Sequence, residues 1–215
     1  MKLTHYCNQP IAGIETASNS KSFHQLRRTL LTTNIPTPVM FVAGETGSWR
    51  IEKSDAVSGD GLDIAPRLFV ADGNQVPIGG AWSLMGTSSN GRYVSRSEAD
   101  DLSKVQEGLG RPQANCAALI PIRKSAAWWD LAQDERRSII EGQSHHIRTG
   151  MEYLPAISRK LYHCRDLGEP FDFLTWFEYR PDHIRHFEQL LERLRATVEW
   201  QYVEREVDIR LRREG

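Results

Sequence analysis

Residues 159–179, RKLYHCRDLGEPFDFLTWFEY, contain two strand-like runs joined by a short turn. The runs, 159–165 and 171–179, are rich in apolar residues, and the linking residues include Gly168 and Pro170, which suit a hairpin loop. Side chains in the second run alternate between two faces, and both faces carry large apolar groups. The segment therefore predicts a β-hairpin with neither face plainly exposed to solvent.

The flanking residues predict a complete module around this hairpin. A strand is predicted at 117–124 and a helical region at 128–140. After the hairpin, Pro181 opens a helix whose apolar residues recur at helical spacing: Ile184, Phe187, Leu190, Leu191 and Leu194. The last predicted strand has one apolar face: Val203, Val207, Ile209 and Leu211. The order β-α-β-β-α-β predicts an α+β, ferredoxin-like fold, with an antiparallel sheet, helices on one face and the other face free.

Residues 37–116 predict a reduced first module of the same kind, before the complete module at 117–215. Two β-forming runs, 38–44 and 48–54, flank turn residues and predict a hairpin, and further extended segments are expected at 82–85 and 92–94. Residues 59–80 are rich in Gly, Asp and Pro, and no strand is predicted there. Residues 1–36, with a short amphipathic piece at 23–31, form an N-terminal extension of no assigned role.

A helix is predicted near the end of this first module. Ser95 and Glu98 have the spacing of a capping box, in which each side chain bonds the backbone of the other residue. The predicted helix carries Leu102, Val105 and Leu109, and the glycines at 108 and 110 are expected to end it.

The composition is that of a soluble globular protein. Of 215 residues, 40% are hydrophobic and 26% charged, which suits one compact unit or two small fused ones able to enclose a sizeable ligand. The 27 Lys and Arg residues nearly balance the 28 Asp and Glu residues, giving a formal net charge of -1. This balance argues against nucleic acid or an anionic membrane as the partner.

Features that report on the cellular compartment favour the cytoplasm. No apolar run approaches the roughly 20 residues of a membrane-spanning helix, and the N-terminus lacks the apolar stretch of a secretory signal. The three cysteines, Cys7, Cys116 and Cys164, are widely spaced without a CxxC pair. They predict reduced thiols rather than a disulfide framework or a zinc cluster.

Some residues have side chains suited to chemistry, but each also has an ordinary explanation. His145 and His146 offer imidazoles that bind haem iron or other metals, although surface or helix-end histidines are more common. Because the two are adjacent and point in different directions, at most one would serve as a ligand. Arg159 begins a largely apolar strand, where its guanidinium needs an anionic partner, and an ordinary ion pair is the more frequent explanation.

Four further residues are equally open when taken singly. Glu199 lies between the last helix and the last strand, where a capping or solvated carboxylate explains it. Trp128 and Trp129 suit packing in a core or interface, and Cys164 suits an inert buried thiol. Fold alone does not decide among these functions.

Four segments taken together closely resemble the chlorite dismutase family. They are AALIPIRKSAAWW (117–129), SHHI (144–147), YLPAISRKLYHCRDLGEPFDFLTWFEY (153–179) and ATVEWQYVEREVDIRL (196–211). The resemblance is collinear and covers about residues 37–215, strongly after Tyr93 and more weakly before it. It implies a ferredoxin-like enzyme that binds haem b.

The resemblance also implies roles for particular residues. In this family the proximal haem ligand lies thirteen residues before a distal arginine, which selects His146 as the iron ligand and Arg159 as the catalytic residue. Glu199 matches the carboxylate that accepts the other ring N–H of the proximal histidine. The other matched positions are expected to line the haem: Tyr93 and Lys124 at the propionates, Trp128 and Trp129 beside it, and Leu154, Phe173 and Thr175 on the distal wall.

The activity implied is the conversion of chlorite into chloride and dioxygen, through O–Cl cleavage followed by O–O bond formation. Arg159 would hold first chlorite and then hypochlorite by its permanent positive charge. Because no net proton transfer or external electron is required, a guanidinium that does not titrate suits the site better than a general acid.

Related haem proteins provide the competing interpretations. Coproheme decarboxylases place a reactive tyrosine four residues before the propionate-binding lysine, where this chain has Ile120, and usually have glutamine in place of Arg159. A haem-binding or sensing protein, a weak peroxidase, or a dimer that only associates with partners are the alternatives. The resemblance is to the short branch of the family, so a homodimer is expected, with chlorite as its small anionic substrate.

Overall fold

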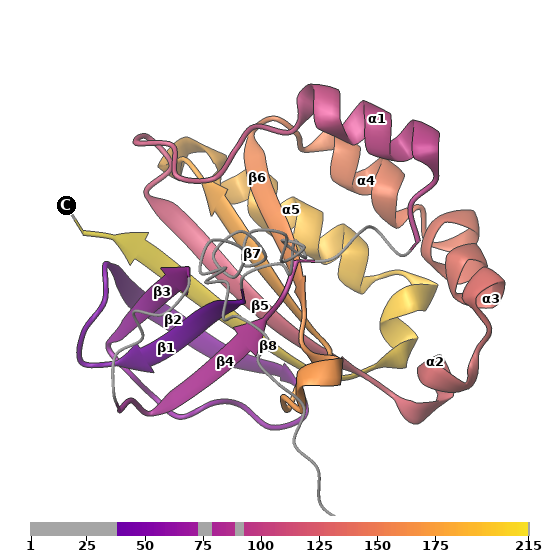
Figure 1. Cartoon of the computed structure of the whole chain (residues 1–215). Helices are drawn as coiled ribbons and strands as arrows, with labels where there is room; N and C mark the ends of the chain where they lie inside the picture. Colours follow the sequence, from indigo (N-terminus) through magenta and orange to yellow (C-terminus); the bar gives the residue numbers. More distant parts are fainter. Residues whose placement is uncertain (1–37, 73–78, 89–92, 215) are drawn as a thin grey trace, which may run out of the picture. The chain divides into compact units, whose positions relative to one another are not determined.

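The computed structural model describes residues 38–72, 79–88 and 93–214 (Figure 1). All of them belong to one compact unit. The predicted extension at 1–36, its amphipathic piece and Cys7 lie outside the described residues, as does Arg92. No helix within the described ranges is long and apolar enough to cross a membrane.

Eight antiparallel strands form one sheet, in the order β4-β1-β3-β2-β8-β5-β7-β6 (Figure 1). The strands are β1 Val39–Gly44, β2 Trp49–Ser58, β3 Arg67–Asp72, β4 Trp82–Gly86, β5 Cys116–Lys124, β6 Ile157–His163, β7 Phe173–Tyr179 and β8 Val203–Arg213. Thr87, directly after β4, exchanges two backbone hydrogen bonds with His163 of β6, at 2.9 and 2.8 Å. The two ends of the strand order therefore meet, and the sheet closes on itself.

The helices of the described chain are short. They are α1 Arg96–Val105, α2 Ala126–Asp130, α3 Gln133–Arg137, α4 His146–Glu152 and α5 Ile184–Arg195. A π-helical turn, Ser138–Gln143, follows α3, and a 3-10 turn, Val198–Tyr202, leads from α5 into β8. Figure 1 shows α5 lying along one face of β5, β7 and β8, with α4 and α1 beyond it.

Apolar side chains form a separate cluster on each face of the sheet. Inside the closed sheet, residues of β1 to β4 pack against Leu119, Trp176 and other residues of β5, β7 and β8. On the outer face, Ala118 and Ile120 pack against α5 through Phe187 and its neighbours. The α+β, ferredoxin-like class is therefore confirmed, but the prediction of a free sheet face is wrong, because the first four strands cover that face.

The second half of the chain matches its predicted elements closely. The hairpin of β6 and β7, the helix after Pro181 and the last strand are all present. In β8, Val207, Ile209 and Leu211 lie in the inner cluster as predicted. Val203 packs against the outer cluster instead, because the pairing of β8 with β5 shifts register between Arg123 and Lys124.

The first half departs from prediction in how its strands pair. β1 and β2 do not form a hairpin, because β3 lies between them and pairs with the whole of β1 but only with Trp49 and Arg50 of β2. On its other edge, β2 pairs with β8 from Trp49 to Ser58. β3 itself was not predicted, because its six residues lie within the Gly-, Asp- and Pro-rich segment.

Two smaller predictions in this half have different outcomes. The capping box is confirmed: the Glu98 backbone N–H donates to the Ser95 hydroxyl, and the Ser95 backbone N–H donates to the Glu98 carboxylate. The helix ends at Val105, because Gln106 is already extended, so Leu109 lies beyond it. The expected extended segment around Tyr93 is not a strand in the described residues 93–94.

Candidate active site

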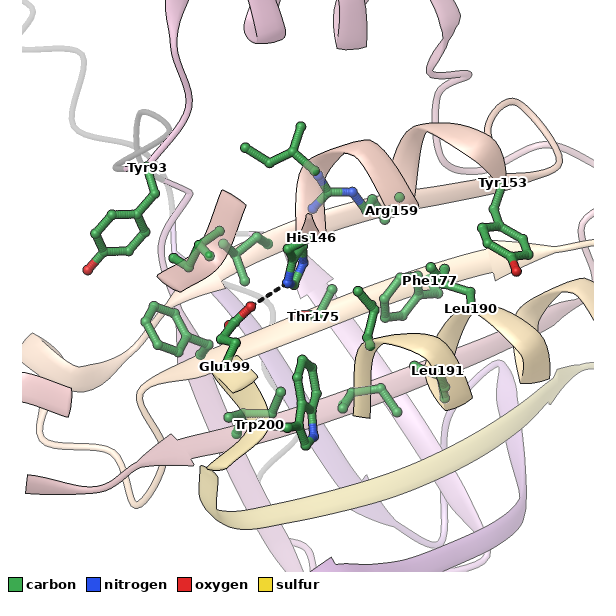
Figure 2. A pocket seen from close by; sticks show the side chains of 18 of the residues that line it. Tyr93, His146, Tyr153, Arg159, Thr175, Phe177, Leu190, Leu191, Glu199 and Trp200 are labelled. Atoms are coloured by element: carbon green, nitrogen blue, oxygen red, sulfur yellow. Dashed lines mark hydrogen bonds and ion pairs between the residues drawn. The ribbon is translucent and has the colours of Figure 1, made fainter. Parts of the chain in front are cut away.

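The main cavity lies between the outer face of the sheet and the helices that cover it (Figure 2). Its volume is about 1250 Å³, counted with its open mouth. The floor comes from alternate residues of three strands: Ile120, Ile122 and Lys124 of β5, Arg159, Leu161 and His163 of β6, and Phe173, Thr175 and Phe177 of β7. Residues of α4, α5 and the turn before β8 close the other side. The lining is largely apolar, as expected for a ligand site.

His146, rather than His145, reaches this cavity. His145 adopts a left-handed backbone conformation with φ of 51° and is exposed, with its Nδ1 2.9 Å from the carbonyl oxygen of Glu141. The chain turns there into α4, whose first residue is His146. Glu141 also caps this helix, because its carboxylate accepts the backbone N–H of Ile147 at 2.7 Å. The backbone geometry thus turns His146, and not His145, toward the cavity.

Glu199 is hydrogen-bonded to the His146 ring at Nδ1 (Figure 2). Its Oε2 lies 2.7 Å from His146 Nδ1, and its Oε1 accepts from the Lys124 ammonium at 2.9 Å. The side chains of Lys124 and Glu199 are only 4% and 7% exposed. Burial raises the pKa of Glu199, but the charges and hydrogen bonds of His146 and Lys124 outweigh it and lower that pKa to about 2. An ionised carboxylate therefore faces Nδ1 and leaves Nε2 as the ring nitrogen available to a ligand.

Arg159 brings a positive charge to the same cavity. Within the part of the chain that the structure describes, its guanidinium forms no ion pair or hydrogen bond, and only its backbone carbonyl is engaged, by Gln106 at 3.0 Å. Burial lowers the pKa of Arg159, but a guanidinium remains charged in proteins. A half-buried cation without a protein counter-ion creates a site for a small anion.

Two aromatic residues at one end of the cavity have polar groups suited to an anionic ligand. The Trp128 indole is 1% exposed, and its N–H has no acceptor among the described residues. The Lys124 ammonium lies 4.7 Å from the centre of the Trp128 ring. Tyr93 also lines the cavity, and its hydroxyl accepts from Arg136 at 3.1 Å.

The remaining predicted site residues divide into two groups. Leu154, Phe173 and Thr175 line the cavity, and their place on the distal wall of a haem stays a prediction. Trp129 is not among the residues that line the cavity, and its place beside a bound haem stays a prediction. Its indole N–H donates to Asp172 at 3.2 Å and its ring stacks on Phe173, because consecutive residues of α2 point in different directions.

Lys124 lines the cavity and is also paired with Glu199. The lysine was expected to bind a haem propionate, but its ammonium is paired with the Glu199 carboxylate and with the Glu199 carbonyl oxygen at 3.3 Å. Its first function in the structure is therefore to neutralise Glu199. Only its remaining N–H would be available to a propionate.

Sequence reasoning missed Trp200, whose ring lies nearly parallel to that of His146, at 24° with the centroids 6.3 Å apart. It also missed Glu141 and Ser144; the Ser144 hydroxyl accepts the backbone N–H of Glu199 at 3.0 Å. The adjacency of Trp200 to Glu199 was a usable signal for the first. Glu141 and Ser144 had no such signal in the sequence, because both act at turns, which hydrophobic periodicity does not predict.

The comparisons with known proteins agree on one family. A family model described as Chlorite dismutase matches residues 76–213. A chlorite dismutase from Ideonella dechloratans is 34% identical over 98 residues, which cover 45% of this chain. The chain spans about a third (33%) of the length of that relative.

Solved structures give the same result. The crystal structure of dimeric chlorite dismutases from Nitrobacter winogradskyi is 56% identical, with a TM-score of 0.78, and the match covers 82% of this chain and 99% of that one. A mutant chlorite dismutase from Candidatus Nitrospira defluvii is 19% identical, with a TM-score of 0.58, over 87% of this chain and 95% of that one. At this lower identity, the second likeness shows a shared fold alone.

Proposed function

Because this chain belongs to the chlorite dismutase family, we propose that it is a haem b-dependent enzyme that converts chlorite into chloride and dioxygen. The proposal rests on the side chains that line the main cavity. One wall presents His146 with its Nδ1 committed to Glu199, and the sheet presents the Arg159 guanidinium with no counter-ion among the described residues.

The residues of the cavity fit a haem group. Nε2 of His146 is a free imidazole nitrogen of the kind that binds haem iron, and the apolar strand residues suit the faces of a macrocycle. The buried Trp128 N–H lacks an acceptor in the described chain, which a propionate oxygen would supply. Tyr93 lies at the same end of the cavity and offers a second polar contact.

The chain's own residues hold the reactants. Bound haem supplies the iron redox chemistry on which O–Cl cleavage and O–O bond formation depend. Arg159 binds the chlorite anion by charge and N–H donation, and it retains the hypochlorite fragment so that both oxygen atoms end in dioxygen. The overall reaction, ClO2⁻ to Cl⁻ and O2, balances without protons or external electrons, which agrees with a guanidinium that stays charged.

Glu199 and Lys124 act through His146. The ionised carboxylate accepts the Nδ1–H of His146, which makes the imidazole a stronger electron donor through Nε2. Lys124 keeps that carboxylate ionised although it is buried. Ile120 is also part of the cavity wall, so the position at which decarboxylases of the wider family carry a reactive tyrosine offers no phenol here.

The proposed assembly is a homodimer. It is supported by the 56% identical relative, which is described as dimeric. Light scattering on the purified chain should then give twice the mass of the 24.5 kDa polypeptide. A monomer or a pentamer would contradict this part of the proposal.

The test of the function is a product balance. Haem-loaded protein should convert each chlorite into one chloride and one dioxygen, and His146→Ala, prepared in the same way, should bind haem weakly and release no dioxygen. Chlorite consumption that yields chlorate or bleached haem without dioxygen would overturn the proposal and favour a peroxidase or haem-handling role.

A further inference from the structure

Two consecutive residues contact the His146 ring from different directions (Figure 2). Glu199 accepts the Nδ1–H at the edge of the imidazole, at 2.7 Å. The Trp200 indole lies nearly parallel to the imidazole, with 24° between the ring planes and 6.3 Å between the centroids. Both residues come from the turn Val198–Tyr202, and both line the main cavity.

A buried ion pair fixes the orientation of Trp200. Its indole N–H donates to Glu206 Oε2 at 2.8 Å, and Glu206 is 0% exposed. The other oxygen of Glu206 accepts two hydrogen bonds from Arg195, at 2.9 and 2.6 Å. Because Arg195 also donates to Asp208, the carboxylate that holds the indole is itself held by α5 and β8.

One hydrogen bond restrains the plane of a ring but still allows a range of angles. The bond between His146 and Glu199 keeps Nδ1 near the carboxylate, but the two side-chain torsions of the histidine can still vary within the range of angles that the bond tolerates. A flat group that lies nearly parallel to the ring and beside it narrows this range, because a larger rotation would bring the imidazole toward the indole. Trp200 is the residue that the described structure places in that position.

We propose that Trp200, oriented by the buried Glu206, is a positioning residue that sets the plane of the His146 imidazole. The contact itself is a property of the folded chain. Its consequence rests on the proposed function: if His146 binds haem iron, the ring plane sets how the imidazole orbitals overlap those of the iron, and Trp200 thereby tunes the iron without touching the substrate.

The contact can be tested without haem or chlorite, by NMR of the full-length chain with isotopically labelled histidine. The His146 resonances are assigned as those missing from His146→Ala. In Trp200→Phe, which removes the indole and its bond to Glu206, the resonances of the His146 ring protons should shift, because the ring current of a fixed indole is replaced by that of a smaller ring that no hydrogen bond orients. The matched control is Trp176→Phe, because Trp176 also donates to a buried glutamate, Glu178 at 3.0 Å, but lies in the inner core cluster.

Glu206→Gln supplies a second, independent variant. The amide offers one acceptor in place of two, and the Arg195 guanidinium is expected to take it, which leaves the amide N–H groups facing the indole N–H. His146 should then shift as in Trp200→Phe. If Glu206→Gln does not fold, Trp200→Phe alone decides.

The second measurement uses haem-loaded protein and electron paramagnetic resonance of the ferric state. Trp200→Phe should change the rhombicity of the high-spin signal, which depends on the orientation of the axial imidazole, whereas Trp176→Phe should not. Unchanged His146 resonances and unchanged rhombicity in Trp200→Phe, or equal changes in both variants, would overturn the proposal. Failure to release dioxygen would refute the proposed function but leave the NMR result standing.

Discussion

Glu199 is hydrogen-bonded to both Lys124 and His146 at the wall of the cavity. Its negative charge therefore acts on both of these neighbours. Glu199 is ionised because its two neighbours lower its pKa to about 2 in spite of burial, which alone would raise it. The buried Lys124 has no other carboxylate partner among the described residues. Removing the charge of Glu199 would therefore affect stability as well as iron ligation.

Glu199→Gln should lower the free energy of unfolding by about 3–5 kcal/mol, because it leaves the Lys124 ammonium buried without a counter-ion. The measurement is urea denaturation of the haem-free chain at pH 7. The matched control is Glu204→Gln, which breaks a pair with Arg123 whose side chains are 51% and 43% exposed and should cost less than about 1 kcal/mol. Equal losses in the two variants would show that the buried pair has no special importance.

The roles of single residues could be predicted only from the resemblance of whole segments, and not from each residue taken alone. Composition and spacing did not distinguish His145 from His146 as a possible ligand, and only the resemblance selected His146. The left-handed backbone at His145 explains why the His146 ring is the one that faces the cavity. The sequence could not show that Trp128 lines the cavity and Trp129 does not, because a tandem of tryptophans does not reveal which ring faces inward. The pairing of Lys124 with Glu199 joins residues 75 positions apart and has no local signal.

At the scale of elements, α5 and β8 are joined by charged side chains as well as by the apolar cluster. Arg195 of α5 donates to Glu206 and Asp208 of β8, and Arg210 of β8 donates to Asp208 and to Glu188 of α5. Burial raises the pKa of Asp208, but hydrogen bonds and charge from Arg210 and Arg195 outweigh it, so the pKa lies below its usual value. This network also holds the carboxylate that orients Trp200.

The network predicts how stability depends on pH. Because the pKa of Asp208 is lower in the folded than in the unfolded chain, its contribution is fully present above the unfolded value of about 3.9 and is lost as pH falls toward the folded value. The difference in unfolding free energy between the parent and Asp208→Asn should therefore be largest at neutral pH and shrink below about pH 4. Urea denaturation from pH 7 to pH 2 checks this.

Asp55→Asn is the control for loss of one carboxylate, because the pair of Asp55 with Lys53 is about half exposed. If the difference in unfolding free energy between the parent and Asp208→Asn stays constant across the whole pH range, the pKa of Asp208 is not lowered in the folded chain.

The elements that could be predicted were those with a strong local pattern. The capping box at Ser95, the hairpin of β6 and β7, and the amphipathic α5 each carry their signal within a few residues. The pairing of β1 with β3 rather than β2 depends on contacts between distant segments, which periodicity does not report. β3 was hidden because its short run lies between turn-forming residues.

For the whole molecule, closure of the sheet separates the structural core from the chemistry. The inner cluster fills the closed sheet, whereas the main cavity lies on the outer face under α4 and α5. Closure requires β4 to approach β6 closely, and Gly86 lies at this contact: a Cβ there would lie 2.7 Å from the Cβ of Tyr162. A residue with any side chain would force the two ends of the sheet apart.

Gly86→Ala should therefore destabilise the chain by about 1–3 kcal/mol, the usual range for forcing extra atoms into a packed contact. Gly108→Ala is the matched control, because a Cβ at that position meets no atom within 4 Å. Thermal unfolding of the two variants beside the parent checks the expectation. If Gly86→Ala unfolds at the same temperature as Gly108→Ala, the close approach of β4 and β6 is not needed for stability.

The most direct test of the central claim is dioxygen release by haem-loaded protein after addition of chlorite, for the parent and for Arg159→Ala. The parent should release close to one dioxygen per chlorite. Arg159→Ala should retain haem but turn over roughly tenfold to a hundredfold more slowly, the effect of losing about 1.5–3 kcal/mol of charged hydrogen bonding, and should bleach faster as hypochlorite escapes. Equal dioxygen release and equal bleaching in the two proteins would contradict the role given to Arg159.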